Sequence, residues 1–213
     1  TWDHHWTITL PSGYTGNDTS DIETFTDQGE GKIYIVVTNK NKNEAKLIDE
    51  VDGSVFGSKN IPNSGSNAAY AFGIDQQALN AGGNMYFAGK LINGNNTIAC
   101  ATISQTGGHI TGLNNSDPRF WNEVGTNSNN GGFGNLYDVE VDGDGYPYVL
   151  DNSNNKIHKY HKCDGSSNSL QYIGSKTCSG LTSLYGFGIN KSNNHIYAAS
   201  YGGSRVVKLD MSG

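Results

Sequence analysis

Hydrophobic and polar residues alternate with a period of two along most of this 213-residue chain, in short runs separated by Gly, Asn and Asp. Residues 136–161 show the pattern most clearly, with an apolar strand, an Asp-Gly turn, a Tyr-rich strand, an Asn-rich turn and a third strand. Side chains that alternate in this way point to the two faces of a β-sheet. The pattern therefore predicts consecutive short strands joined by tight turns.

The same unit recurs along the chain. Similar segments begin at residues 21, 69 and 184, and the first strand of every unit leads into an anchor residue: Asp27, Asp75, Asp142 or Asn190. The anchors are spaced by 48, 67 and 48 residues, and a third strand with a Gly-containing turn follows in each unit. Outer strands are expected at 55–61, at 109–113 or 119–124, and at 169–175. Units of this size, with three or four short strands, are typical of β-propeller blades.

We therefore predict an all-β fold, a four-bladed β-propeller that forms a single domain over residues 1–213. The blades are expected at about 20–62, 69–125, 134–176 and 182–213. Because the last unit lacks an outer strand, we expect the N-terminal strand 5–10 (HWTITL) to pair with it and close the ring, which removes an open sheet edge. The alternative is an arc of a larger propeller, completed by further sequence or by another chain.

The two faces of the inner strands differ in composition. The positions one, three and five before the anchor are apolar in the last three units, as packing against a neighbouring blade requires. The positions two and four before it are small in the second and fourth units, where they are Gly73, Ala71, Gly188 and Gly186. Because glycine permits close backbone approach, these positions predict inner strands that lie close together around an axis.

The third and fourth units resemble the NHL-type propeller repeat. In residues 136–161 the likeness lies in VEVDGDGYPYVLDNSNNKIHKY, and residues 184–210 follow the same pattern with Asn190 in place of Asp and Gly202-Gly203 in place of the Asn pair. The resemblance implies the propeller architecture. Its signature residues belong to turns and to packing, so it implies no catalytic residues.

The charge excludes one class of partner. The formal net charge is −6 and the sequence pI about 5.4, so no basic surface is available to offset the repulsion of nucleic-acid phosphates. No apolar run is long enough to span a bilayer. Sequons at Asn17, Asn95, Asn114 and Asn190, with the sparing use of Lys and Glu, favour an extracellular or secreted glycoprotein.

Three cysteines cannot all pair within one chain. Cys163 and Cys178 are close enough in sequence to form a disulfide, but they flank a predicted hairpin asymmetrically, so the bridge and its absence are both open. In either case Cys100 is expected to be a buried free thiol.

Two groups of residues are candidates for a site. Glu23, Asp138 and Glu140 lie on the axial face of the first and third blades, where they could bind Ca²⁺ in the central channel or remain solvated at its mouth. Arg119, Phe120 and Trp121 in the insertion 114–134, together with Trp2, are of the types enriched at binding surfaces. The alternative role for these aromatic residues is to anchor an outer strand or the N-terminal strand.

The function predicted from these features is that of a non-enzymatic extracellular scaffold for binding or assembly through protein–protein contacts. A carbohydrate-binding, lectin-like propeller is the first alternative, because Tyr and Trp can stack on sugars. A metal-assisted lyase or hydrolase is the second, because some enzymes on NHL-like propellers are lyases with a His-bound metal, although no such set of histidines is visible in this sequence. The expected partner is a protein or a glycan, and self-assembly is also compatible with the sequence.

Overall fold

The computed structural model of the chain describes residues 19–26, 31–39, 44–60, 69–74, 84–90, 96–106, 109–113, 133–164 and 170–210. Sheet 1 contains β1 (Thr19–Thr26), β2 (Ile33–Asn39), β3 (Glu44–Asp49) and β4 (Val55–Asn60). Sheet 2 contains β5 (Ala69–Ile74), β6 (Asn84–Lys90), β7 (Asn96–Thr106) and β8 (His109–Leu113). Sheet 3 contains β9 (Leu136–Val141), β10 (Pro147–Asp151), β11 (Lys156–Tyr160) and β12 (Tyr172–Thr177). Sheet 4 contains β13 (Leu184–Asn190), β14 (His195–Ser200) and β15 (Arg205–Leu209).

Each sheet is an antiparallel meander in chain order, which confirms the predicted all-β fold and its succession of similar sheets. The outer strands predicted near 55–61, 109–113 and 169–175 are β4, β8 and β12, while residues 119–124 lie outside the described residues. Within the described ranges, no helix is long and apolar enough to cross a membrane.

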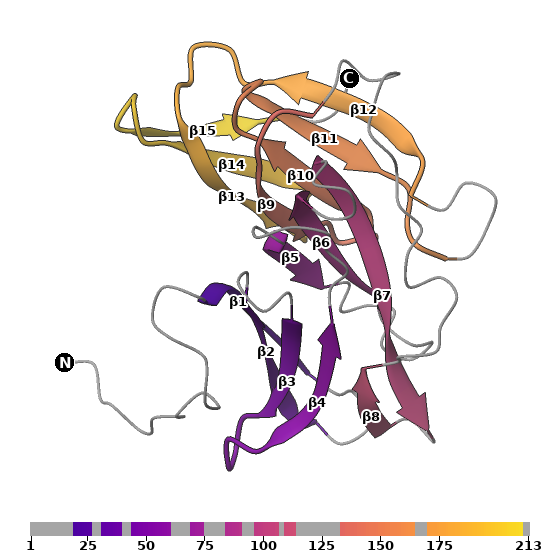
Figure 1. The fold of residues 1–213 in the computed structure, drawn as a ribbon. Helices are drawn as coiled ribbons and strands as arrows, with labels where there is room; N and C mark the ends of the chain where they lie inside the picture. The colour runs from indigo at the N-terminus through magenta and orange to yellow at the C-terminus, as the bar shows by residue number, and fades with distance from the viewer. Residues whose placement is uncertain are drawn as a thin grey trace.

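The four sheets follow one another along an arc (Figure 1), with sheet 1 at one end and sheet 4 at the other. Their first strands contact each other in succession, β1 with β5, β5 with β9 and β9 with β13, so these strands line the inside of the arc. The predicted closure by residues 5–10 lies outside the described residues, and it stays a prediction together with the number of blades.

The anchor residues close the first hairpin of a sheet through their side chains. Asp142 Oδ1 accepts hydrogen bonds from the N–H groups of Asp144 (3.0 Å) and Tyr146 (2.8 Å). Asn190 Oδ1 accepts from the N–H (3.1 Å) and hydroxyl (2.7 Å) of Ser192. Asp and Asn recur at this place because their short side chains bond the backbone of a tight turn.

Every sheet carries a tyrosine at the same place in its second strand. Each of these residues pairs with the position two before the anchor, and they are Tyr34, Tyr86, Tyr148 and Tyr197. The same face carries an apolar pair from the second and third strands: Val36 with Leu47, Ala88 with Ile98, Leu150 with Ile157, and Ala199 with Val206. We call this side of a sheet its tyrosine face.

The tyrosine face is buried in sheets 1 to 3 and exposed in sheet 4. Tyr34, Tyr86 and Tyr148 are at most 2% exposed, whereas Tyr197 is 40% exposed. The third-strand residue of the apolar pair is fully buried in the first three sheets, but Val206 is 67% exposed. The burial of this face therefore depends on whether another sheet follows.

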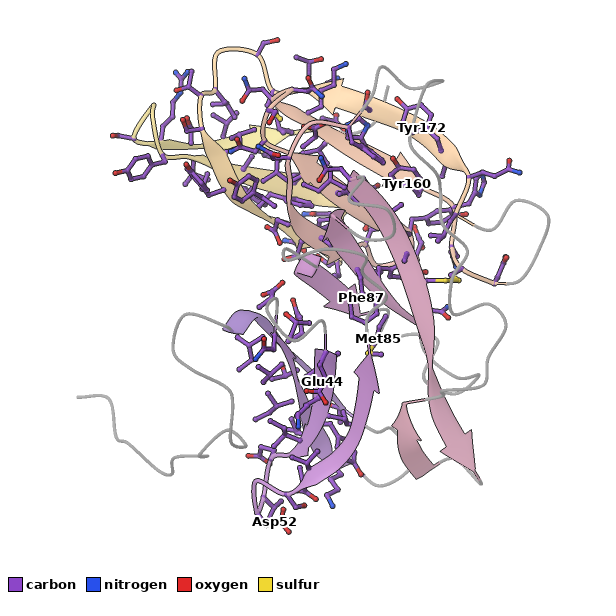
Figure 2. All side chains as sticks on the ribbon, in the orientation of Figure 1. Glu44, Asp52, Met85, Phe87, Tyr160 and Tyr172 are labelled. Atoms are coloured by element: carbon purple, nitrogen blue, oxygen red, sulfur yellow. A yellow bond between two sulfur atoms is a disulfide. The ribbon has the colours of Figure 1, made fainter. Side chains whose placement is uncertain are left out.

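The core lies in the layers between consecutive sheets. The tyrosine face of sheet 2 packs on Val139 and Val141 of β9, and that of sheet 3 packs on Phe187 and Ile196 of sheet 4. Figure 2 shows Met85 and Phe87 on the side of sheet 2 that faces sheet 1, and both are fully buried. The alternate positions of the inner strands thus pack against the preceding sheet, as the sequence predicts.

Close approach of the inner strands explains one of the glycines. A Cβ at Gly73 of β5 would come within 2.9 Å of the Val139 carbonyl oxygen in β9, so only glycine fits there without a shift of the backbone. The equivalent Gly188 in sheet 4 has nothing within 4 Å of such a Cβ. The prediction of close approach is therefore confirmed at Gly73, and it does not explain Gly188, which lies on the exposed face.

The burial pattern predicts unequal effects of the same substitution. Tyr148→Ala is expected to lower the free energy of unfolding by about 3–5 kcal/mol, because it leaves a cavity between two sheets. Tyr197→Ala, measured in dilute solution, is expected to lower it by less than about 1 kcal/mol. Urea unfolding followed by circular dichroism measures both values, and equal losses would contradict the described order of the sheets.

Candidate functional site

The exposed tyrosine face of sheet 4 continues into the turn between β14 and β15. Tyr185 is 55% and Tyr201 81% exposed, and these rings border a hollow of about 930 Å³. The hollow is lined by Tyr185, Ala199, Ser200, Tyr201, Ser204, Arg205 and Val206. We call these seven residues, together with Tyr197, the tyrosine surface.

Ser200 holds the β14–β15 turn against the segment that precedes β13. Its hydroxyl accepts hydrogen bonds from the N–H groups of Thr182 and Gly203, both at 3.1 Å, and donates one to the Thr182 carbonyl oxygen at 2.8 Å. The backbone N–H of Tyr201 donates to the Ser183 carbonyl at 3.2 Å. Tyr201, whose ring is exposed, therefore lies in a turn that is held in place by hydrogen bonds to its backbone and to Ser200.

The tyrosine rings support one another across two sheets. The Tyr185 ring meets the Tyr137 ring edge to face at 5.3 Å between centroids, and meets the Tyr201 ring in the same way at 6.0 Å. The Arg205 guanidinium donates a hydrogen bond to the Gly180 carbonyl oxygen. Such edge-to-face pairs orient large aromatic side chains, so less conformational entropy is lost when a partner covers them.

The composition of the tyrosine surface suits contact with a protein. Exposed tyrosines, an arginine and a valine line one hollow, and hot spots at protein interfaces are enriched in Tyr and Arg. Lys208, on the same face, and Arg205 add positive charge to a chain whose net charge is −6. The site can therefore combine burial of apolar area with hydrogen bonds to carbonyl or carboxylate oxygens.

The acidic residues predicted as an axial site do lie near one another. Burial raises the pKa of Asp138 to about 7, although the Phe187 N–H donates a 2.8 Å hydrogen bond to its carboxylate. Burial, followed by the charges of Asp138 and Glu23, raises the pKa of Glu140 to about 8 against the opposing effect of Lys191. Burial, and then Asp21, also raise the pKa of Glu23.

These carboxylates do not form a ready metal site. Among the residues that the structure describes, no three His, Cys, Asp or Glu side chains are grouped so that they could hold a metal ion. Protonation of buried carboxyls relieves the same repulsion that a cation would relieve. The Ca²⁺ predicted at Glu23, Asp138 and Glu140 stays a prediction.

The expectation that Cys100 is a free thiol is wrong, and the bridge between Cys163 and Cys178 that the sequence left open does not form. The disulfide joins Cys100 of β7 to Cys163, with 6.4 Å between their Cα atoms, and Cys178 is a buried free thiol. The physical reason is the order of the layers, because Cys100 and Cys163 belong to the core between sheets 2 and 3 whereas Cys178 lies in the next core. Burial raises the pKa of the Cys178 thiol to about 11, which makes it a poor nucleophile.

A buried Asp–His pair lies inside sheet 3. The Asp151 carboxylate is fully buried and lies 3.5 Å from His158 Nε2, and it accepts hydrogen bonds from the N–H groups of Gly134 (2.9 Å) and Asn154 (3.1 Å). Burial alone would raise the pKa of Asp151, but the nearby His158 side chain and the hydrogen bonds from Gly134 and Asn154 lower it. Its position is equivalent to Ser200 in sheet 4, and both residues tie the end of the second strand to the segment before the first. We interpret the pair as a structural one.

Most of the other predicted site residues lie outside the described residues. These are Trp2, Arg119, Phe120 and Trp121, and the sequons at Asn17, Asn95 and Asn114. Asn190 is exposed, but its side chain closes the β13–β14 turn. Its glycosylation stays a prediction.

The tyrosine surface was not among the sites predicted from the sequence. Tyr185 lies five positions before the anchor Asn190, where the alternation predicts packing against a neighbouring blade. The signal that could have drawn attention to Tyr197 is the tyrosine that recurs at the same place in every repeat: Tyr34, Tyr86, Tyr148 and Tyr197.

Solved structures share this fold, whereas no family model and no curated protein matches the chain. The β-propeller domain of Cps50 (Swd1) from Myceliophteria thermophila superposes with a TM-score of 0.55 at 10% identity, over 91% of this chain and 54% of that one. A functionally unknown protein from Desulfotomaculum acetoxidans gives 0.60 at 19% identity, over 98% and 58%. A protein of unknown function from Bacteroides caccae gives 0.53 at 12% identity, over 98% and 61%.

The chain is thus similar in fold to β-propellers. At such low identities the likeness shows the fold alone, and it shows neither an NHL-type repeat nor a function. The chain spans between 54% and 61% of the length of these structures.

The raised carboxyl pKa values predict that stability falls as the pH rises. The folded protein holds protons on Asp138 and Glu140 that the unfolded chain has released, so the free energy of unfolding decreases between about pH 5 and pH 8. The double variant Asp138→Asn/Glu140→Gln should flatten this slope in urea titrations at several pH values. Asp52→Asn is the control, because hydrogen bonds from Ser54 lower the pKa of Asp52 and keep it ionised throughout. An equally steep slope in the double variant would contradict the assignment.

The disulfide predicts a specific linked peptide. Proteolysis without reduction should release a peptide pair that contains Cys100 and Cys163, with Cys178 alkylated only after unfolding. Cys163→Ser should lower the free energy of unfolding by about 2–4 kcal/mol, because the crosslink no longer restricts the unfolded chain. A pair that contains Cys163 and Cys178 in the mass spectrum would refute the pairing.

Proposed function

We propose that this protein is a non-enzymatic β-propeller scaffold that binds a protein partner through the tyrosine surface. The observation that carries the proposal is the exposure of Tyr197 and Val206, at positions that are fully or almost fully buried in the other three sheets. A face built to be covered, but left in contact with solvent, is the usual sign of a contact surface. Propellers commonly serve as protein-binding scaffolds, and the likeness to solved propellers supports this general role.

The proposal includes an extracellular location. A disulfide between Cys100 and Cys163 is of the kind that persists in oxidising compartments, and it is rare in the cytosol. The low content of charged residues (16%) and the four sequons agree with this location. Glycosylation at these sequons is part of the same proposal.

The proposal also retains the NHL-type character of the repeat. Its support is the sequence pattern of residues 136–161 and 184–210, together with the Asp142 and Asn190 turns that this pattern specifies. These residues act in turns and packing, so the NHL-type character agrees with a scaffold and adds no catalytic role.

A cross-linking comparison tests the role of the tyrosine surface. The purified protein and the variant Tyr201→Ser are incubated with the extracellular fraction of the source cells, and the cross-linked proteins are identified by mass spectrometry. A protein partner should be recovered with the wild type and reduced about tenfold or more with the variant, since a hot-spot residue contributes about 2 kcal/mol or more and tyrosine is enriched among hot spots. Ile173→Ser, which changes an apolar residue with 43% exposure on β12, is the matched control.

Two results would contradict this proposal. Equal recovery of every protein by wild type and Tyr201→Ser would exclude the tyrosine surface as the contact. Binding on a glycan array that depends on Tyr201, without any protein partner, would favour the lectin-like alternative.

A further inference from the structure

Sheet 3 carries an ionisable pair at two buried places where no other sheet has an ionisable residue. In the register of the second and third strands, the residues equivalent to His158 are Ile48, Ala99 and Val207. The residues equivalent to Asp151 are Val37, Gly89 and Ser200. Val37 and Ile48 belong to a buried apolar cluster of sheet 1. In sheet 3 the same places hold Asp151 and His158, which are at most 1% exposed.

The geometry of the pair does not favour stability. His158 Nε2 lies 3.5 Å from Asp151 Oδ2, and neither ring nitrogen has a hydrogen-bond partner among the residues that the structure describes. A buried polar group without a hydrogen bond costs free energy, and the replacement of a buried ion pair by apolar residues is often neutral or stabilising. Sheet 1 shows that the architecture accepts valine and isoleucine at these two places. Net stability therefore does not explain the pair.

Asp151 holds the segment that leads into β9. Its Oδ2 atom accepts a hydrogen bond from the Gly134 N–H at 2.9 Å, and a Cβ at residue 134 would come within 2.7 Å of Oδ1. The Asn135 N–H donates to Ser153 Oγ at 3.0 Å, and the Asn135 carbonyl accepts from the Asn152 N–H at 2.9 Å. The segment is thus bonded both to Asp151 and to the β10–β11 turn.

His158 contacts the preceding residue of the same segment. The Phe133 ring meets the imidazole edge to face at 5.2 Å between centroids, and it lies 6.2 Å from the Tyr160 ring. Tyr160 and Tyr172, which are labelled on sheet 3 in Figure 2, are 5.8 Å apart and complete this aromatic group. The carboxylate and the imidazole therefore contact two consecutive residues, Gly134 and Phe133.

We propose that the Asp151–His158 pair fixes residues 133–135 in one position on sheet 3 and contributes no net stability. The carboxylate directs the Gly134 N–H, and the imidazole, which can carry the opposite charge, packs against Phe133. A valine–isoleucine pair would bury apolar area but would offer no acceptor to Gly134. Because residue 134 ends the insertion 114–134, the pair also sets the point at which the insertion joins sheet 3.

Two double variants test the contribution to stability by urea unfolding. Asp151→Val/His158→Ile reproduces the residues of sheet 1, and Asp151→Ala/His158→Val is smaller at both places, so excess volume cannot decide both results. At least one of them should have a urea midpoint equal to or above that of the wild type. Asp151→Ala or His158→Val alone should lower the midpoint, because each leaves the other polar group buried without its partner.

Amide hydrogen exchange, followed by NMR, tests the position of the segment. In the stable double variant the amides of Asn135 and Asn152 should exchange about tenfold faster or more, because Gly134 no longer holds the segment through a charge-assisted hydrogen bond. Neither amide loses its own acceptor in this variant. The Tyr146 amide, bonded in another turn of sheet 3, is the internal reference. Asp151→Asn keeps an oxygen acceptor for Gly134 and should retain most of the protection.

Two results would overturn the proposal. If both double variants are less stable than the wild type, the pair contributes net stability. If Asn135 and Asn152 exchange at the wild-type rate in a stable double variant, the pair does not fix the segment.

Discussion

The packing of each tyrosine face on the following sheet is the contact on which the rest of this structure depends. A β-sheet with an apolar face must bury that face against another element of the structure. Here each sheet shares a layer of core with its neighbour, and residues such as Tyr86 and Leu150 are buried only because another sheet covers them. Stability is thus cooperative along the arc, and the last sheet exposes the surface that the others bury.

The same packing also determines the environment of the inner-strand carboxyl groups and of the disulfide. The inner strand β9 carries Asp138 and Glu140, whose pKa values are raised first by burial and then by the charges of neighbouring carboxylates. The Cys100–Cys163 bridge crosses the layer between sheets 2 and 3, where the Tyr86 hydroxyl also accepts a hydrogen bond from the Cys163 N–H at 3.1 Å. Covalent and polar contacts therefore reinforce the layer that apolar packing creates.

The strands could be predicted from local sequence patterns. The disulfide and the tyrosine surface could not, because they depend on contacts between residues that are distant in sequence. The alternation around Asp142 and Asn190 gave the strands, their order and the turns, because those features depend on neighbours in sequence. The disulfide partner of Cys163 is 63 residues away, so no local pattern could select it over Cys178. The tyrosine surface was missed for a related reason, since alternation shows that Tyr197 faces one side of a sheet and not whether that side is covered.

Hydroxyl-radical footprinting of the tyrosines, read by mass spectrometry, tests the central claim most directly. In dilute solution, Tyr197 and Tyr201 should be oxidised much faster than Tyr34, Tyr86 and Tyr148, because only the former two are accessible in a single chain. Rapid oxidation of Tyr148, or protection of Tyr197 equal to that of Tyr86 in the single chain, would contradict the layered packing described above.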